Sequence, residues 1–274
     1  MSGGVCCPKS LEQLWPLLDD GAVAMAGGTD LLARRRGRAP AFVACLERIE
    51  SLCGVREEDG FLRLGACETH SRLLRHPLVA GRLPVLARAL SVLGSPLVRN
   101  MGTLGGNIVT ASPAGDTLAP LYALDAVVEL ASRQGTRRVP LAGFILGPGR
   151  TGLQPGEIVA AVLAPLPDAG ALQHFEKVGR RKALAISVVS LAAVIATDSQ
   201  GVVTQARLAF GSVGPTVARC PRAEALLAGR RLDRESLLAA GEALRGEISP
   251  IDDLRATAAY RRDVAGNLLL RLAQ

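Results

Sequence analysis

The first segment with residue types suited to ligand chemistry contains two glycines, Gly27 and Gly28, followed by Thr29 and Asp30. The preceding residues 22–26 are apolar and predict a short strand. Two glycines after a strand let the backbone turn tightly and present consecutive N–H groups, an arrangement that binds anions such as phosphate. The carboxylate of Asp30 repels phosphate, so it would hold the loop through neighbouring N–H groups or contact a ribose hydroxyl. The alternative is an ordinary turn, because short glycine motifs also occur by chance.

The second segment, residues 99–117, is longer and consists largely of small or hydrogen-bonding residues. Its glycines and its polar side chains include Gly102, Thr103, Gly105, Gly106, Asn107, Thr110, Ser112 and Gly115. This composition predicts a long loop in which a bulky polar ligand lies close to the backbone. A flexible surface loop is the alternative. The apolar Leu104, Ile108 and Val109 argue against that alternative, because a disordered linker would lack them.

Neither segment matches the common phosphate-binding motifs. The Rossmann pattern G-x-G-x-x-G and the P-loop pattern G-x-x-x-x-G-K-[ST] are absent from both. A dinucleotide bound here would therefore need a different architecture. We also find no acid–base constellation, since His70, His76 and His174 are isolated in the sequence. An isolated histidine is more often structural or exposed than catalytic.

Cysteine spacing bears on metals and on the cellular compartment. The cysteines are Cys6, Cys7, Cys45, Cys53, Cys67 and Cys220, and none forms a C-x-x-C pair. This spacing is unsuitable for zinc or for an iron–sulfur cluster, so we expect no metal on this chain. The pattern instead indicates reduced, partly buried thiols in a cytoplasmic protein. The N-terminus lacks a signal-peptide pattern, and no apolar run is long enough to span a membrane.

Length and composition limit the possible classes of protein. The 274 residues are enough for one large or two modest domains. Apolar residues make up 49% of the chain and aromatic residues only 3%, so the cores must consist mainly of Ala, Leu and Val. The net charge of +7 would permit nucleic-acid binding, but it equally suits an anionic cofactor or an acidic partner subunit. Because the arginines are scattered and aromatic side chains are scarce, we do not expect nucleic-acid binding.

Capping patterns predict where helices begin in the first half of the chain. Ser10, followed three residues later by a glutamine, fits a capping box and predicts a short helix to about Leu18. Thr69 predicts a cap for a helix through Leu74. Residues 77–93 carry apolar side chains at helical spacing and predict one helix, despite an internal proline. Strands are expected at residues 22–26, 42–46, 61–65, 126–131, 137–140 and 157–164.

The character of the sequence changes after residues 165–170, which form the clearest linker in the chain. Residues 185–197 and 202–210 predict two strands, and the turn residues 198–201 between them predict a hairpin. Three helices are expected to follow, at residues 221–227, 233–245 and 251–272. Strands followed by helices indicate an α+β second domain.

Several of these segments resemble a known family when they are taken together. Residues 26–32 and 103–108 are similar to the two FAD-binding segments of xanthine dehydrogenase-type enzymes, which include carbon monoxide dehydrogenase medium subunits. The similarity continues in order through residues 110–116, 147–158 and 175–181. Each motif is weak alone, but five in register are hard to produce by chance. The chain thus resembles the FAD-binding (medium) subunit of a molybdenum hydroxylase.

The resemblance implies an α+β fold with two domains. Residues 1–168 would form an FAD-binding domain of the vanillyl-alcohol-oxidase (PCMH) type, with subdomains at about 1–55 and 56–168 and FAD between them. Residues 171–274 would form a small α+β domain with a three-stranded sheet and helices. Some relatives hold an extra iron–sulfur cluster in an inserted segment. No such insertion and no clustered cysteines occur here, so we expect no cluster.

The resemblance also implies roles for individual residues. The implied cofactor-binding residues are Met25, Ala26, Gly27, Gly28, Thr29, Asp30, Leu31, Leu93, Gly94, Thr103, Gly105, Gly106, Asn107, Ile108, Asp116 and Lys177. The two adjacent glycines and Thr29 would hold the pyrophosphate, and Asp116 would bond a ribose hydroxyl at the adenosine end. Leu93 departs from the aromatic residue that some relatives have near FAD. Lys177 would lie near the flavin and stabilise its anionic reduced form. The alternative is that Lys177 is a solvated strand residue.

The function implied is that of an oxidoreductase subunit acting in a complex. In relatives, a substrate is hydroxylated at a molybdenum–pterin centre on a large subunit, and electrons pass through two [2Fe-2S] clusters on a small subunit to FAD. The flavin then reduces NAD⁺ or another acceptor. Molybdopterin and the clusters would belong to partner subunits. One alternative is a stand-alone FAD-dependent oxidoreductase, which needs acid–base residues at a substrate pocket. The other is a cofactor-free scaffold, which predicts damaged glycine segments. The sequence shows neither feature.

Overall fold

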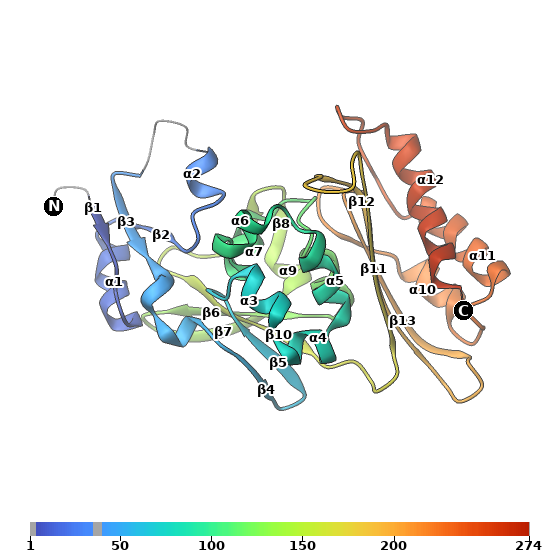
Figure 1. Cartoon of the computed structure of the whole chain (residues 1–274), viewed down its shortest axis with the longest axis horizontal. Helices are drawn as coiled ribbons and strands as arrows, with labels where there is room; N and C mark the ends of the chain where they lie inside the picture. The colour runs from blue at the N-terminus through green and yellow to red at the C-terminus, as the bar shows by residue number, and fades with distance from the viewer. Residues whose placement is uncertain (1–3, 35–39, 274) are drawn as a thin grey trace. The chain divides into compact units, whose positions relative to one another are not determined.

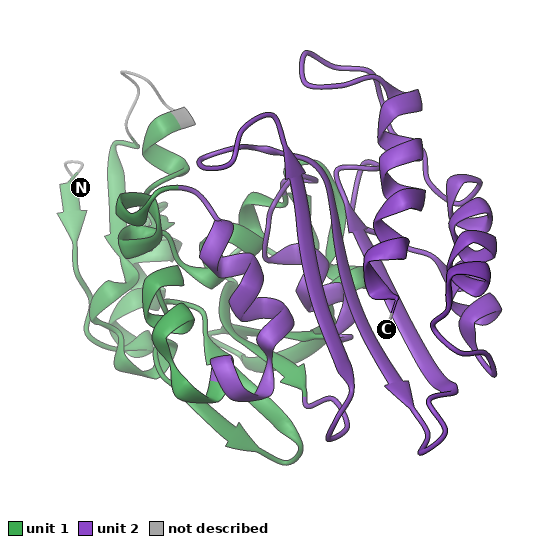
Figure 2. Cartoon of the chain, turned by 45° about the vertical axis from the view of Figure 1, so that its right-hand side comes forward, with its two compact units in different colours: residues 1–78, 95–111, 126–165 green, residues 79–94, 112–125, 166–274 purple. Residues whose placement is uncertain are grey.

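The computed structural model describes residues 4–34 and 40–273 of the chain. The chain divides into two units, coloured separately in Figure 2. Unit 1 contains residues 1–78, 95–111 and 126–165, and unit 2 contains residues 79–94, 112–125 and 166–274. The chain therefore passes between the units several times, and the second glycine-rich segment contributes residues to both of them.

Unit 1 contains a small parallel sheet with the strand order β1-β3-β2. Its strands are β1 (Gly4–Cys6), β2 (Val23–Met25) and β3 (Phe42–Cys45), followed in the chain by the 3₁₀ turns η1 (Leu46–Arg48) and η2 (Glu50–Leu52). Helix α1 (Leu11–Asp19) begins at the predicted cap, where the Ser10 hydroxyl accepts the Gln13 N–H. Leu14 of α1 and Ala44 of β3 are fully buried in one core cluster.

The larger sheet of unit 1 is antiparallel, in the order β4-β5-β10-β6-β7 (Figure 1). Its strands are β4 (Val55–Glu58), β5 (Phe61–Gly65), β6 (Val127–Ser132), β7 (Gly135–Pro140) and β10 (Ile158–Pro165). Four of them confirm sequence predictions, whereas β4 and the earlier β1 were not predicted. The remaining elements of the unit are α2 (Leu31–Arg34), α3 (His70–Arg75), α6 (Pro96–Met101), α7 (Leu104–Thr110), α9 (Leu141–Phe144), β8 (Ile145–Gly147) and β9 (Arg150–Thr151).

The prediction of a loop over residues 99–117 is wrong in its first part, because the end of α6 and all of α7 lie there. The hydroxyl of Thr103 accepts an N–H of the first turn of α7 and caps the helix. Leu104 and Ile108, one turn apart on α7, are both fully buried. Burial of this apolar pair outweighs the low helix propensity of the two glycines between them.

Unit 2 is built on an antiparallel sheet with the order β11-β12-β13-β14. Its strands are β11 (Leu172–Gly179), β12 (Ser187–Thr197), β13 (Val203–Gly211) and β14 (Ala218–Arg219). The three long strands are those that the resemblance implies, and β14 adds a two-residue strand at the edge. The predicted hairpin joins β12 to β13. In it the Asp198 carboxylate accepts the N–H groups of Gln200 and Val202 at 2.8 and 2.9 Å.

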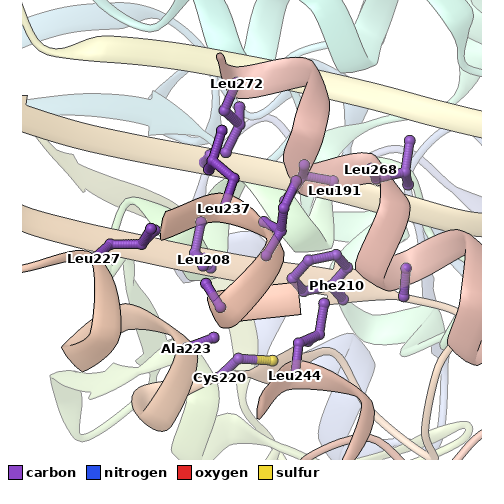
Figure 3. Close-up of a cluster of buried hydrophobic side chains, with 14 of the residues drawn as sticks. Leu191, Leu208, Phe210, Cys220, Ala223, Leu227, Leu237, Leu244, Leu268 and Leu272 are labelled. Carbon is purple, nitrogen blue, oxygen red and sulfur yellow. The ribbon is translucent and has the colours of Figure 1, made fainter. Parts of the chain in front are cut away.

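Helical elements complete unit 2. They are α4 (Pro77–Arg82), which begins at the end of unit 1, α5 (Pro84–Val92), α8 (Leu118–Ala123), α10 (Pro221–Leu227), α11 (Arg234–Arg245), α12 (Ala258–Leu268) and the 3₁₀ turn η3 (Leu269–Leu272). Figure 3 shows the core between the sheet and the C-terminal helices, where Leu191, Leu208 and Phe210 meet Leu237 and Leu244. Helices α5 and α8 also contact the sheet. This double cover explains why residues 187–195 of β12 are buried on both faces of the sheet.

The predicted single helix over residues 77–93 is divided into α4 and α5 at Pro84. Proline lacks an N–H and clashes with the preceding turn, so it starts a new helix at its first position instead of continuing the old one. In the described parts of the chain, no helix is long and apolar enough to cross a membrane.

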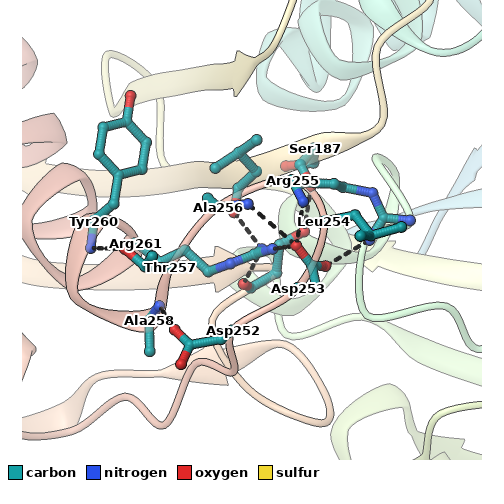
Figure 4. Close-up of polar contacts among 12 residues, drawn as sticks. Ser187, Asp252, Asp253, Leu254, Arg255, Ala256, Thr257, Ala258, Tyr260 and Arg261 are labelled. Carbon is teal, nitrogen blue, oxygen red and sulfur yellow. Dashed lines mark hydrogen bonds and ion pairs between the residues drawn. The ribbon is translucent and has the colours of Figure 1, made fainter.

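The predicted helix over residues 251–272 is wrong at its beginning, because α12 starts well inside that range. The Asp253 carboxylate accepts the N–H groups of Arg255 and Ala256 at 2.7 and 3.2 Å, which forms a turn there instead (Figure 4). The same carboxylate accepts a hydrogen bond at 2.6 Å from the buried guanidinium of Arg261 on α12. These contacts offset the burial of Asp253 and hold its pKa at about 2.

Candidate functional site

The first glycine-rich segment leaves β2 and turns into α2. Gly28 has a φ of +67°, in the left-handed region that side chains disfavour. At Gly27, a Cβ would lie 1.7 Å from the carbonyl oxygen of Met101, so no side chain fits there. The other predicted residues here, Met25, Ala26, Asp30 and Leu31, are partly buried, and Thr29 is exposed. The positive φ of an ordinary turn explains the glycine at position 28. Position 27 must be glycine for another reason, because Met101, which is distant in the sequence, packs against it.

The second segment is held in place by the start of α3. The N–H of His70 donates to the Gly102 carbonyl at 3.0 Å, and Thr69 forms an antiparallel bridge with Thr103. The Thr103 hydroxyl accepts the N–H of Gly106 at 3.2 Å. The backbone is therefore fixed on both sides of Thr103, which is inconsistent with the alternative of a flexible surface loop.

The two predicted segments come together within unit 1, at the contact between Gly27 and Met101 and at two further places. A Cβ on Gly102 would lie 3.3 Å from the Thr29 hydroxyl oxygen, so the backbones approach closely there too. The Thr110 hydroxyl donates to the Asp30 carboxylate at 3.0 Å. Asp30 thus links the first loop to the end of α7.

The predicted residues of α7 divide into two groups. Gly105 and Ile108 are buried, and a Cβ on Gly105 would lie 2.7 Å from the Cβ of Ala66. These two residues therefore pack the helix against unit 1. Gly106 is exposed and Asn107 is partly exposed. Of the four predicted residues of α7, only this second pair reaches the surface.

His70 is a residue of the site that sequence reasoning did not select. Its ring is buried, and a Cβ on Gly102 would lie 3.2 Å from its Cδ2 atom. Burial, together with the nearby Arg99, lowers the pKa of His70 to about 4, so the ring is neutral at physiological pH. The sequence around His70 does not indicate that its ring packs beside Gly102, because only the fold brings these two residues together.

In unit 2, two predicted residues that are far apart in the chain form a buried ion pair. The Lys177 ammonium donates to the Asp116 carboxylate at 2.6 Å, with side-chain exposures of 7% and 8%. Lys177 Nζ also donates to the Val92 carbonyl at 3.3 Å. Val92 precedes the predicted Leu93 and Gly94, and Gly94 has a φ of +47°. The alternative that Lys177 is a solvated strand residue is therefore wrong.

Burial governs the charge state of this pair. It raises the pKa of Asp116 to about 6, although Lys177 acts in the opposite direction. The direct contact also limits the roles implied by the resemblance. The adenosine ribose and the flavin of an extended FAD are separated by a pyrophosphate, so two touching side chains cannot serve both ends.

Two observations fit FAD. Gly27 packs directly against the Met101 backbone, so the two glycine-rich segments that the resemblance assigns to FAD lie against each other. One carboxylate oxygen of Asp116, Oδ1, is buried and lacks a hydrogen-bond partner among the described residues. A cofactor hydroxyl would satisfy that acceptor. No group of three or more His, Cys, Asp or Glu side chains able to hold a metal occurs in residues 4–34 and 40–273.

Two family models match almost the whole chain. Residues 1–167 match the FAD binding domain in molybdopterin dehydrogenase, and residues 173–274 match the CO dehydrogenase flavoprotein C-terminal domain. The fold and the glycine-rich segments therefore define an FAD-binding flavoprotein. The chain belongs to the family of FAD-binding subunits of xanthine and carbon monoxide dehydrogenase-type enzymes, which confirms the resemblance in its sequence.

Relatives and solved structures agree with this assignment. The nicotinate dehydrogenase FAD-subunit of Eubacterium barkeri is 33% identical, over 97% of this chain and 93% of the relative. The carbon monoxide dehydrogenase of Hydrogenophaga pseudoflava, solved without the Mo-pyranopterin moiety of its cofactor, superposes with a TM-score of 0.92 at 33% identity, covering 99% of this chain and 96% of that chain. Quinoline 2-oxidoreductase of Pseudomonas putida 86 gives 0.93 at 28% identity, covering 100% and 96%. The predicted fold class, the FAD cofactor and the oxidoreductase assignment are confirmed.

Proposed function

We propose that this chain is the electron-transfer subunit of a molybdenum hydroxylase. It receives electrons from the [2Fe-2S] clusters of a small partner subunit and passes them to NAD⁺ or another acceptor. The observation that carries the proposal is the contact of Gly27 with the Met101 carbonyl, which joins the two glycine-rich segments into one backbone surface. The bound FAD supplies the redox chemistry, and the chain positions the cofactor and tunes it.

We propose a role for each predicted cofactor-binding residue of unit 1. Met25 and Ala26 lead the chain into the loop, and the adjacent glycines with Thr29 hold the pyrophosphate. Gly106 and Asn107 contact the cofactor from the second segment, while Thr103 fixes their backbone by capping α7. Asp30 and Leu31 continue the first loop, and Gly105 and Ile108 act indirectly, because they pack α7 against the core.

For unit 2 we propose that Asp116 and Lys177 act together at the flavin end. Asp116 and the carbonyl of Val92 accept two of the three N–H groups of the ammonium. Among the described residues no third acceptor is present, so one N–H remains for a ligand. A cation fixed in this way stabilises negative charge on a neighbouring group. Leu93 and Gly94 follow Val92 and would lie near the same part of the cofactor.

The proposed assembly has at least three polypeptides. A large subunit would bind molybdopterin and a small subunit would carry the [2Fe-2S] clusters. Within this chain, we propose an FAD-binding domain at residues 1–168, with subdomains at about 1–55 and 56–168, and a C-terminal domain at residues 171–274. All six cysteines are free thiols, which supports a cytoplasmic location.

The proposal is tested on the native complex. The tagged chain is purified from its own cells under anaerobic conditions, and FAD, molybdenum and iron are quantified together with the co-purifying chains. We expect two partners, all three components, and bleaching of the flavin bands when NADH is added. A flavin-containing chain without partners or metals would contradict the electron-transfer role. If NADH leaves the flavin oxidised while the hydroxylase substrate reduces it, the acceptor is not NAD⁺.

A further inference from the structure

Two cysteines that the proposed function leaves unused lie next to each other in unit 1. Strands β1 and β3 are parallel, and the register that pairs Cys6 with Ala44 brings the next residue, Cys7, beside Cys45. Neighbouring strands lie about 4.8 Å apart, which is within the range of Cα separations that a disulfide spans.

The two thiols differ in their access to solvent. Cys7 is exposed, whereas Cys45 is buried, with 8% of its surface accessible. Burial, and then the neighbouring Cys7, raises the pKa of the Cys45 thiol. An oxidant in solution therefore reaches Cys7 first, and Cys45 is placed to react second.

Of the other cysteines, Cys53 is partly buried. Cys67 is buried, and its thiol lies 3.9 Å from the Leu46 carbonyl oxygen. Cys220 is fully buried in the core of unit 2. Cys6 is adjacent to Cys7 in the sequence, so it provides a close control for reactivity that depends on position.

We propose that Cys7 and Cys45 are a redox modification site, at which a peroxide converts the thiol pair into a reversible disulfide. The Cys7 sulfur attacks one oxygen of hydrogen peroxide, so that an S–O bond forms, the O–O bond breaks and one water leaves. The Cys45 sulfur then attacks the sulfenic sulfur, so that the S–S bond forms and a second water leaves. Two electrons pass from the thiols to the peroxide, and a dithiol reductant reverses the reaction by exchange.

The location of the disulfide gives it a consequence for the first glycine-rich segment. The closed loop between Cys7 and Cys45 contains α1, β2, Gly27, Gly28 and α2. Cys45 is also paired in register with Met25, the last residue of β2 before those glycines. Cross-linking therefore restricts the unfolded chain and joins the end of β1 to the end of β3, the strand with which β2 pairs. This inference does not depend on the proposed electron-transfer role.

The test is peptide mapping of the purified full-length chain after treatment with hydrogen peroxide. Trypsin releases Cys6 and Cys7 on peptide 1–9 and Cys45 alone on peptide 39–48. We expect these two peptides to appear as one cross-linked species under non-reducing conditions, and as separate thiol peptides after dithiothreitol. The oxidised protein should also melt about 5 °C or more above the reduced form.

Two variants identify the reacting sulfur. Cys7→Ser should abolish the cross-link and the shift in melting temperature, whereas Cys6→Ser should leave both unchanged. The proposal is overturned if peptide 39–48 keeps a free thiol while Cys7 proceeds to sulfinic acid, or if the cross-link survives Cys7→Ser. Loss of the cross-link in both variants would indicate that a vicinal Cys6–Cys7 disulfide is required, and would overturn it as well.

Discussion

The glycine-rich segments of unit 1 and the Asp116–Lys177 pair of unit 2 are built from different kinds of contact. In unit 1 the backbones of two segments touch, and the critical residue, Gly27, contributes by having no side chain. In unit 2 two charged side chains from distant parts of the sequence meet in a buried environment. The first arrangement depends on shape and does not titrate. The second depends on charge and responds to pH.

This difference predicts which substitutions disrupt each region. A backbone surface is lost when any Cβ is added at the point of contact, however small the side chain. A buried ion pair is lost when one charge is removed, because the remaining charge is left without a partner in a poor solvent. Variants of the two regions should therefore differ in size of effect, in pH dependence and in the property that they change.

The largest effect is expected from Gly27→Ala. The new Cβ would lie 1.7 Å from the Met101 carbonyl oxygen, so the two segments must separate. We expect FAD affinity to fall at least about tenfold, measured by fluorescence titration of the apoprotein with FAD. Gly143→Ala on α9 is the control, because Gly143 is exposed and a Cβ there would meet nothing within 4 Å. Equal affinities in the two variants would contradict the backbone contact.

Lys177→Met should have the next largest effect. It leaves the Asp116 carboxylate buried without its cation, at a cost of about 3 kcal/mol in the free energy of unfolding near about pH 8. The cost should shrink near about pH 5, because the pKa of Asp116 is already about 6 with the cation present and rises without it. Urea unfolding at both pH values measures this, with exposed Lys182→Met as the control. A cost independent of pH would show that charge does not matter here.

A smaller contrast is expected between two adjacent glycines of α7. Gly105→Ala collides with Ala66 and should destabilise the fold by about 1–3 kcal/mol. Gly106 is exposed, and a Cβ there would lie 3.0 Å from the Thr103 hydroxyl oxygen, so only that side chain must shift. Gly106→Ala should therefore cost less than Gly105→Ala, about 0.5 kcal/mol, while weakening FAD binding. Thermal unfolding and FAD titration of both variants separate packing from binding. If Gly106→Ala destabilised the fold and Gly105→Ala did not, the two proposed roles would have to be exchanged.

The smallest effect concerns the pH dependence of stability. The folded pKa of His70 is about 4 and its ordinary value is 6.5, so the unfolded chain binds the proton first and stability falls as pH drops between these values. Asp116 acts in the opposite direction, because its raised folded pKa makes protonation below about pH 6 stabilising. We expect His70→Asn to reduce the acid sensitivity and Asp116→Asn to increase it. Parallel pH profiles for both variants would contradict these assignments.

Local contacts were well predicted from the sequence. The caps at Ser10 and Thr69 and the turn at Asp198 each depend on residues within four positions of one another. The first half of the segment at residues 99–117 was misjudged, because glycine content favours a loop. The spacing of Leu104 and Ile108, four positions apart, was the signal in the sequence that indicated a helix. Both side chains are fully buried, and their burial stabilises the helix despite its glycines.

Contacts between distant positions could not be predicted in this way. Asp116 and Lys177 are 61 positions apart, and no spacing rule relates them. The contact of Gly27 with Met101 joins positions that only the completed fold brings together. The family resemblance selected Gly27, Asp116 and Lys177 individually, but it did not indicate what each of them touches.

The most direct test of the account is the flavin content of the purified chain. The wild-type protein should release close to one FAD per chain, and Gly27→Ala should release little while remaining folded by circular dichroism. A folded, colourless wild-type chain that cannot be reconstituted with FAD, either alone or in its native complex, would contradict the central claim that these segments bind the cofactor.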